Sequence, residues 1–195
     1  MPIQEMIAIR NSGSRESNLA LLMAMHCAPL MKKLAMANIL TLSKKEAVGI
    51  RALLKGTDIS CRFLSVKGDK VVLYLYREKE LFAYLQSETV RKFLKEYGYL
   101  EEDTGELIKK LSKRIRLYGN GQTDFPHEIG VFLGYPLPDV KGFIENDGKN
   151  FAYMDYWKVY HNVQEAAKLF CRFDAERETA VREVIMGKTI EEIAV

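Results

Sequence analysis

Two short motifs of the sequence hold the side chains that could take part in chemistry. HCAPLM contains His26 and Cys27, and FPHEIGVFLGYPLPDVKGF, which runs from Phe125 to Phe143, contains His127 and Glu128. A thiol that has a histidine and a carboxylate beside it in space can act as a nucleophile, because the imidazole removes the thiol proton. The pattern therefore suggests thiol-assisted catalysis by Cys27, His127 and Glu128, provided that the fold brings the two motifs together.

The same residues also have structural interpretations. If Cys27 follows the end of a helix, the helix dipole opposes a thiolate there, whereas a helix that begins at Pro29 would favour one. Cys27 is otherwise a small buried hydrophobic residue, and His127 a hydrogen-bonded residue at a helix start. His26, Cys27 and His127 could ligate a metal, but no pair of them has the spacing of a metal motif, so no metal site is predicted.

Aromatic residues near the second motif could form the walls of a small-molecule pocket. Tyr135 lies within the motif, and YWKVY supplies Tyr156, Trp157 and Tyr160. Alternation along a strand would put Trp157 on one face and the two tyrosines on the other, so only one set could line a given pocket. Together with His26, we identify Tyr135 and Trp157 as candidate ligand-binding residues, although aromatic residues in strands are more often core.

The second motif also fits a helix-turn-helix-like corner at about residues 126–146. Gly134 would make the turn in the left-handed conformation, with positive φ. A recognition helix needs base-reading side chains near its start, and this chain has Leu137, Pro138 and Asp139 there. DNA reading is therefore disfavoured, and a packed corner is the simplest interpretation. A nucleic-acid or protein-binding module that uses the corner is the alternative to a small-molecule pocket.

Bulk composition indicates an ordinary globular protein. The chain has 195 residues, of which 48% are hydrophobic and 28% charged, and its formal net charge is +3. The length favours a single domain over residues 1–195, and the charge is too small to imply nucleic acid or membrane as a partner. Three cysteines without CxxC spacing favour a reducing cytoplasm. The apolar stretch from Asn18 to Met31 is too short for a membrane span and predicts a buried helix.

Periodicity and turn signals predict an α+β domain in which several helices pack on a small antiparallel sheet. A hairpin at about 59–76, with its turn at Gly68 and Asp69, and a strand at about 151–160 would form that sheet. One helix is expected from Ser17 or Asn18 to about Met25, ended by Pro29. Capping boxes are expected at Ser43 with Glu46 and at Asn162 with Glu165. Other helices are predicted near residues 80–85, 88–97 and 105–117, within the corner, and at the C-terminus.

Three segments together resemble a known family: HCAPLM, the stretch from Phe125 to Asn146, and YWKVY. The family is an uncharacterised one, mostly from firmicute bacteria, known as domain of unknown function thirty-seven ninety-three. The resemblance covers nearly the whole chain and implies one cytoplasmic bacterial domain, but no activity, substrate or cofactor. Members tend to read GYWKVY, and this chain has Asp155 at the glycine position. The resemblance marks as sites of interest His26, Cys27, His127, Glu128, Tyr135 and Trp157.

The leading hypothesis is accordingly a cytoplasmic protein that binds a small molecule or an unknown cofactor around Cys27 and His127. Thiol-assisted chemistry at that site is part of the hypothesis.

Overall fold

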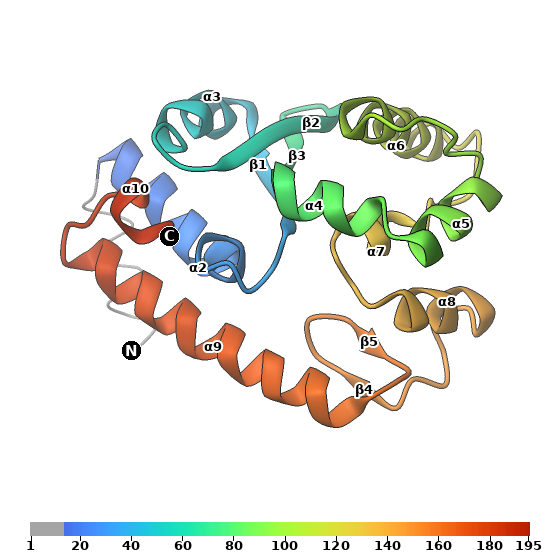
Figure 1. Ribbon diagram of the computed structural model, residues 1–195. Coiled ribbons are helices and arrows are strands. Elements are labelled where there is room, and N and C mark those ends of the chain that lie inside the picture. The colour runs from blue at the N-terminus through green and yellow to red at the C-terminus, as the bar shows by residue number, and fades with distance from the viewer. Residues whose placement is uncertain (1–13) are drawn as a thin grey trace.

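Helices pack against strands that pair antiparallel, which makes the fold α+β. The computed structural model describes residues 14–195 (Figure 1). In chain order its elements are α2 (Arg15–Met31), β1 (Ala37–Ser43), α3 (Lys44–Leu53), β2 (Ile59–Lys67), β3 (Lys70–Arg77), α4 (Glu78–Leu85), α5 (Glu88–Glu96), α6 (Thr104–Gly119), α7 (Ile129–Phe132), α8 (Leu137–Glu145), β4 (Tyr153–Met154), β5 (Lys158–Val159), α9 (Val163–Ile185) and α10 (Ile190–Ile193).

A three-stranded antiparallel sheet in the order β1-β3-β2 forms the centre of the molecule. The predicted hairpin is confirmed, and its turn uses Gly68 with φ of +58°. β3 lies in the middle because it is apolar on both faces. Leu73 and Leu75 belong to one core cluster, whereas Tyr74 and Tyr76 belong to another.

Each face of the sheet therefore has its own hydrophobic core. The first core packs α2, α3, α10 and the C-terminal part of α9 against the sheet, and the second packs α4, α5, α6, α7 and α8 against the opposite face. Figure 1 shows the two groups of helices on either side of the strands. The predicted fold class, α+β with a small antiparallel sheet packed by helices, is confirmed.

The third strand of the sheet differs from the prediction. It is β1, and not a strand at about 151–160. Residues 151–160 instead fold back on themselves, so that β4 and β5 pair only with each other in a separate two-stranded ribbon. β1 was missed because its alternating segment, ANILTLS, runs directly into the cap of the next helix at Ser43 and lacks a turn signal.

The first described helix is also longer than predicted. Its N-cap is Ser14, whose side chain accepts a hydrogen bond from the Ser17 backbone N–H at 3.2 Å, and it continues to Met31 through Pro29. Pro29 falls in the last turn, so its missing N–H leaves only one intrahelical bond unmade, and the buried packing of this turn outweighs that loss. Cys27 therefore lies within the helix.

One of the two predicted capping boxes is present. The Ser43 side chain accepts from the Glu46 backbone N–H at 3.2 Å, and the Ser43 N–H donates to the Glu46 carboxylate at 2.9 Å. The second is wrong: Asn162 is in the left-handed conformation, with φ of +50°, and its side chain makes no cap hydrogen bond. The left-handed backbone at Asn162 turns the chain from the ribbon into α9.

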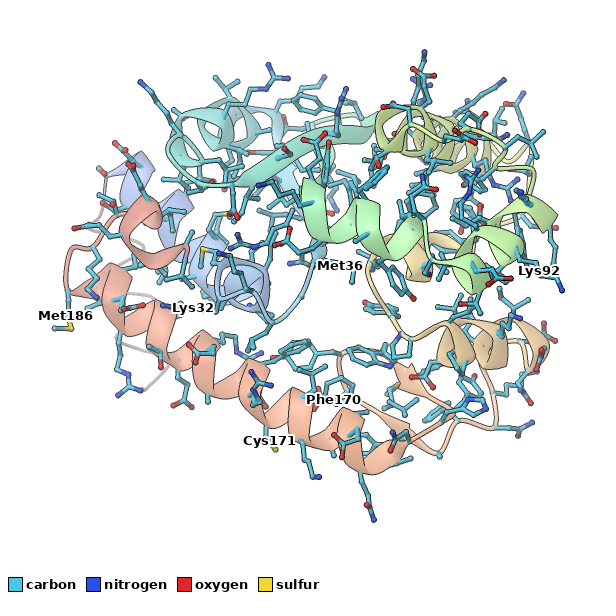
Figure 2. All side chains as sticks on the ribbon, in the orientation of Figure 1. Lys32, Met36, Lys92, Phe170, Cys171 and Met186 are labelled. Carbon is cyan, nitrogen blue, oxygen red and sulfur yellow. The ribbon has the colours of Figure 1, made fainter. Side chains whose placement is uncertain are left out.

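The predicted corner consists of α7, which is a single turn, and α8. Gly134 between them has φ of +79°, as predicted, and the Tyr135 N–H donates to the carbonyl of Gly130 at 2.9 Å. A Cβ atom on Gly134 would lie 2.7 Å from Cγ of Met36, so the corner approaches the α2–β1 connection closely. Figure 2 labels Met36 on that connection.

A buried arginine joins the sheet to two other parts of the chain. Arg77 ends β3 and is 1% exposed. Its Nε donates to the carbonyl of Leu30 at 3.0 Å, and its Nη2 donates to the carbonyls of Met31 at 2.9 Å and Val195 at 2.8 Å. Nη1 pairs with the carboxylate of Asp58. Arg77 thus satisfies the last carbonyls of α2, which have no partners inside the helix.

Candidate functional site

A cleft of about 330 Å³ lies between the corner and the β4–β5 ribbon. We call it the aromatic cleft, because rings from both sides dominate its walls. The corner and the residues before it contribute Phe125, His127, Ile129, Gly130, Leu133, Tyr135, Asp139, Val140 and Phe143, and the ribbon contributes Met154, Asp155, Tyr156, Trp157 and Lys158.

Trp157 occupies the centre of the ribbon wall. Its indole ring stacks on Tyr135 with ring centroids 4.9 Å apart, and it meets the ring of Phe170 edge-on at 4.4 Å. Phe170 extends from α9, the long helix beside the ribbon (Figure 2). The hydroxyl of Tyr84 donates to the carbonyl of Tyr135 at 2.7 Å, which fixes the backbone of the corner at this ring. The two aromatic residues predicted to bind ligand therefore do lie together.

Asp139 holds the ribbon against α8. It lies in the first turn of α8 and is 3% exposed. One carboxylate oxygen accepts from the backbone N–H groups of Tyr160 at 2.8 Å and His161 at 2.9 Å, and the other accepts from the Trp157 indole N–H at 2.9 Å. From the sequence, Asp139 was noted only as a residue unsuited to reading the bases of DNA. Its real partners lie about twenty residues further along the chain and were not visible from local patterns.

A second anchor fixes the ribbon to α9. The Tyr156 hydroxyl donates to the Asp174 carboxylate at 2.9 Å and accepts from Arg177 at 3.0 Å, while Arg177 pairs with Asp174 at 2.6 Å. Burial and the hydrogen bond to Asp174 raise the pKa of Tyr156 to about 12, so the phenol stays protonated at neutral pH. The ribbon wall is thus held from both of its sides.

His127 presents its ring to the cleft without a hydrogen-bond partner among residues 14–195. The ring is exposed and lies between Phe125, at a centroid distance of 5.2 Å, and Phe143, at 5.1 Å. Its two nitrogens are therefore free to donate to or accept from a bound molecule.

Glu128 points away from the cleft, although it is the next residue. It is fully buried, and its Oε1 accepts from the Tyr99 hydroxyl at 2.9 Å and from Nε of Arg114 at 2.5 Å. Its other oxygen has no hydrogen-bond partner among the described residues. Glu128 thereby ties the corner to Tyr99 and α6, and its side chain does not line the cleft that His127 lines.

Cys27 also does not line the cleft. Its side chain is 0% exposed inside α2, and its sulfur accepts a hydrogen bond from the Asn38 amide at 3.3 Å. Burial raises the pKa of the Cys27 thiol to about 12, so the reactive thiolate is scarce at neutral pH. Cys27 contributes to the walls of neither cavity that contains the other candidate residues.

His26 lines a second, smaller cavity of about 120 Å³. This cavity and the aromatic cleft share four lining residues, which are Leu133, Tyr135, Tyr156 and Trp157. His26 lines the smaller cavity and His127 lines the cleft. Each histidine therefore lines a cavity whose walls include Tyr135 and Trp157. The thiol of Cys27 lines neither cavity.

Thiol labelling tests this placement of Cys27. With iodoacetamide at neutral pH, we expect Cys171, which is exposed, to react first, and the half-buried Cys61 to follow. Cys27 should react at least about a hundredfold more slowly than Cys171, because it is both shielded and protonated. Equal rates for all three thiols in denaturant are the control, and labelling of native Cys27 as fast as Cys61 would contradict its burial.

Comparison with known proteins identifies a family for this chain but no activity. A family model described as Protein of unknown function (DUF3793) matches residues 23–194. No curated protein and no solved structure matches the chain. Within residues 14–195, no three His, Cys, Asp or Glu side chains gather in a group that could hold a metal ion. None of the described helices is long and apolar enough to cross a membrane.

Proposed function

The chain belongs to the DUF3793 family of unknown function, and we propose that it binds a small molecule in the aromatic cleft. The cleft itself carries the proposal. Its volume of about 330 Å³ lies within the range of natural ligand pockets, and its walls are largely aromatic and aliphatic with few polar groups, as such pockets usually are.

Rigidity of the walls supports this function. Asp139 fixes the ribbon to α8, the Tyr156–Asp174–Arg177 contacts fix it to α9, and Tyr84 fixes the backbone at Tyr135. A ligand that enters pre-formed walls loses little affinity to the ordering of side chains. The anchoring of this ribbon is thus well suited to a binding site.

His127 is the polar group that would orient the ligand, because its nitrogens have no partner among residues 14–195. Tyr135 and Trp157 would supply flat apolar contact. Cys27 has no part in this function, since its sulfur is buried in α2 and lines neither cavity. The unpaired cysteines support a reducing bacterial cytoplasm as the place of action.

The arrangement of α8 weakens the nucleic-acid alternative. The first turn of a recognition helix must be open to a DNA groove, but Asp139 in that turn is buried against the ribbon. A Cβ atom on Gly142 would lie 2.5 Å from Cγ of Tyr160, so the ribbon also covers the next turn. The exposed Pro138 and Lys141 offer no set of base-reading side chains.

The test uses the single tryptophan of the chain as reporter. Trp157 gives one indole N–H cross-peak in a proton–nitrogen NMR spectrum, and we expect the neutral probe naphthylmethanol to shift it saturably, with a Kd of about 1 mM for so small a ligand. Ile129→Phe fills part of the cleft and should weaken binding at least about fivefold. Val48→Phe, at a 79% exposed position on α3, is the matched control and should bind normally.

Two results would contradict the proposal. One is the absence of a saturable shift in the wild-type protein, and the other is equal binding by the Ile129→Phe variant while its thermal melt shows that it is folded.

A further inference from the structure

The walls of the aromatic cleft contain more negatively charged side chains than positively charged ones. Its walls contain two carboxylates, Asp139 and Asp155, and one ammonium group, Lys158. Asp139 accepts all of its close hydrogen bonds from neutral N–H groups, so its negative charge is stabilised but not cancelled. Among residues 14–195, Asp139 forms one ion-pair contact, with the exposed His161 at 3.9 Å.

Asp155 is the carboxylate that a ligand could reach. It lies in the turn between β4 and β5 and is exposed, and its backbone N–H donates to the carbonyl of Trp157 at 3.3 Å. Its side chain makes no hydrogen bond or ion pair with any residue in the range 14–195. A carboxylate at the rim of an apolar cleft, without a partner of its own, favours a positively charged group.

Lys158 does not supply that partner. Its Nζ donates to the carbonyl of Gly148 at 2.7 Å. The same nitrogen lies over the ring of Phe151, 5.0 Å from the centroid, and over Phe143 at 5.5 Å. The lysine charge is thus engaged by a carbonyl and two rings, and it offsets only one of the two carboxylates. Two carboxylates against one ammonium group leave the carboxylates of the cleft walls in excess.

We infer that the ligand is a cation with an aromatic or otherwise apolar body. Its protonated amine or quaternary ammonium nitrogen would pair with Asp155, and its body would lie between the corner and the ribbon. Aromatic walls strengthen this preference, because the faces of aromatic rings attract cations. The carboxylates of the cleft would repel an anion, and the ammonium group of Lys158 already contacts a carbonyl and two rings. The inference rests on the proposed function, since it names the class of ligand for the same cleft.

Three probes of the same shape test the charge preference: naphthylmethylammonium, naphthylmethanol and naphthoate. Each is titrated against the full chain and followed by the Trp157 indole cross-peak. We expect the ammonium probe to bind at least about fivefold more tightly than the alcohol, and naphthoate to bind more weakly than the alcohol. In the Asp155→Asn variant, the ammonium probe should bind no better than the alcohol.

Asp147→Asn is the matched control, because it removes the same charge from an exposed position that does not line the cleft. Asp147 has φ of +50°, a conformation that asparagine also tolerates, so the backbone is preserved. This variant should keep the preference for the ammonium probe.

The outcomes separate this inference from the proposed function. If the alcohol binds in the cleft but the ammonium probe binds no more tightly, or if Asp155→Asn keeps the preference, the inference is wrong and the function stands. If none of the three probes shifts the cross-peak saturably, the proposed function itself fails.

Discussion

Substitution of Arg77 by methionine is expected to lower the free energy of unfolding by at least about 3 kcal/mol. Methionine fills a similar volume but donates no hydrogen bond. The carbonyls of Leu30 and Met31 end α2, and besides Arg77 they accept backbone N–H groups from Lys33 at 3.3 Å and Val195 at 3.1 Å. The 1% exposure of Arg77 leaves little access for water to replace the hydrogen bonds that its guanidinium donates. The contact with Val195 would also be lost, which would loosen the C-terminal residues from the end of α2.

Two further variants separate these backbone contacts from the ion pair. Asp58 is 55% exposed, so Asp58→Asn should cost no more than about 1 kcal/mol. Arg77→Lys should fall between the two, because one ammonium group cannot reproduce the fork that reaches three carbonyls. Urea unfolding measures all three. A loss below about 1 kcal/mol for Arg77→Met would mean that Arg77 is not what secures the end of α2.

Local features of this fold were predictable because their causes lie within a few residues. Gly68 and Asp69 specify the hairpin turn, Ser43 and Glu46 the capping box, and Gly134 the left-handed turn of the corner. Where tertiary packing decides, the prediction was wrong. Pro29 does not end α2, because the last turn of that helix is buried between other elements and one missing hydrogen bond does not outweigh this burial.

The candidate site was only partly predictable for the same reason. His127 lines one cleft together with Tyr135 and Trp157, the residues predicted to form the aromatic walls of a pocket. Cys27 does not, because its position on the buried face of α2 depends on how that helix packs, and residue type carries no such information. Glu128 is adjacent to His127 in sequence, yet it faces the core, where Tyr99 and Arg114 bind it.

The contacts of Asp139 could not be predicted from sequence, and they carry the second large expected effect. Asp139→Asn is expected to lower the free energy of unfolding by about 2–3 kcal/mol. The carboxylate accepts three N–H groups, from Trp157, Tyr160 and His161. An asparagine amide of the same shape has one acceptor oxygen, and its NH₂ group would face at least one of these donors. At least one N–H in a largely buried place would then lack an acceptor.

The same substitution should release the ribbon wall of the aromatic cleft. The indole N–H of Trp157 should exchange with solvent faster than in the wild-type protein, and naphthylmethanol should bind at least about fivefold more weakly, since the ribbon must then be ordered on binding. Glu145→Gln, an exposed substitution on the same helix, is the control and should change the free energy of unfolding by less than about 0.5 kcal/mol. If Asp139→Asn keeps both the stability and the indole protection of the wild-type protein, Asp139 is not what holds the ribbon. The Tyr156–Asp174–Arg177 contacts, together with the packing of Trp157 against Tyr135 and Phe170, would then suffice to build the wall.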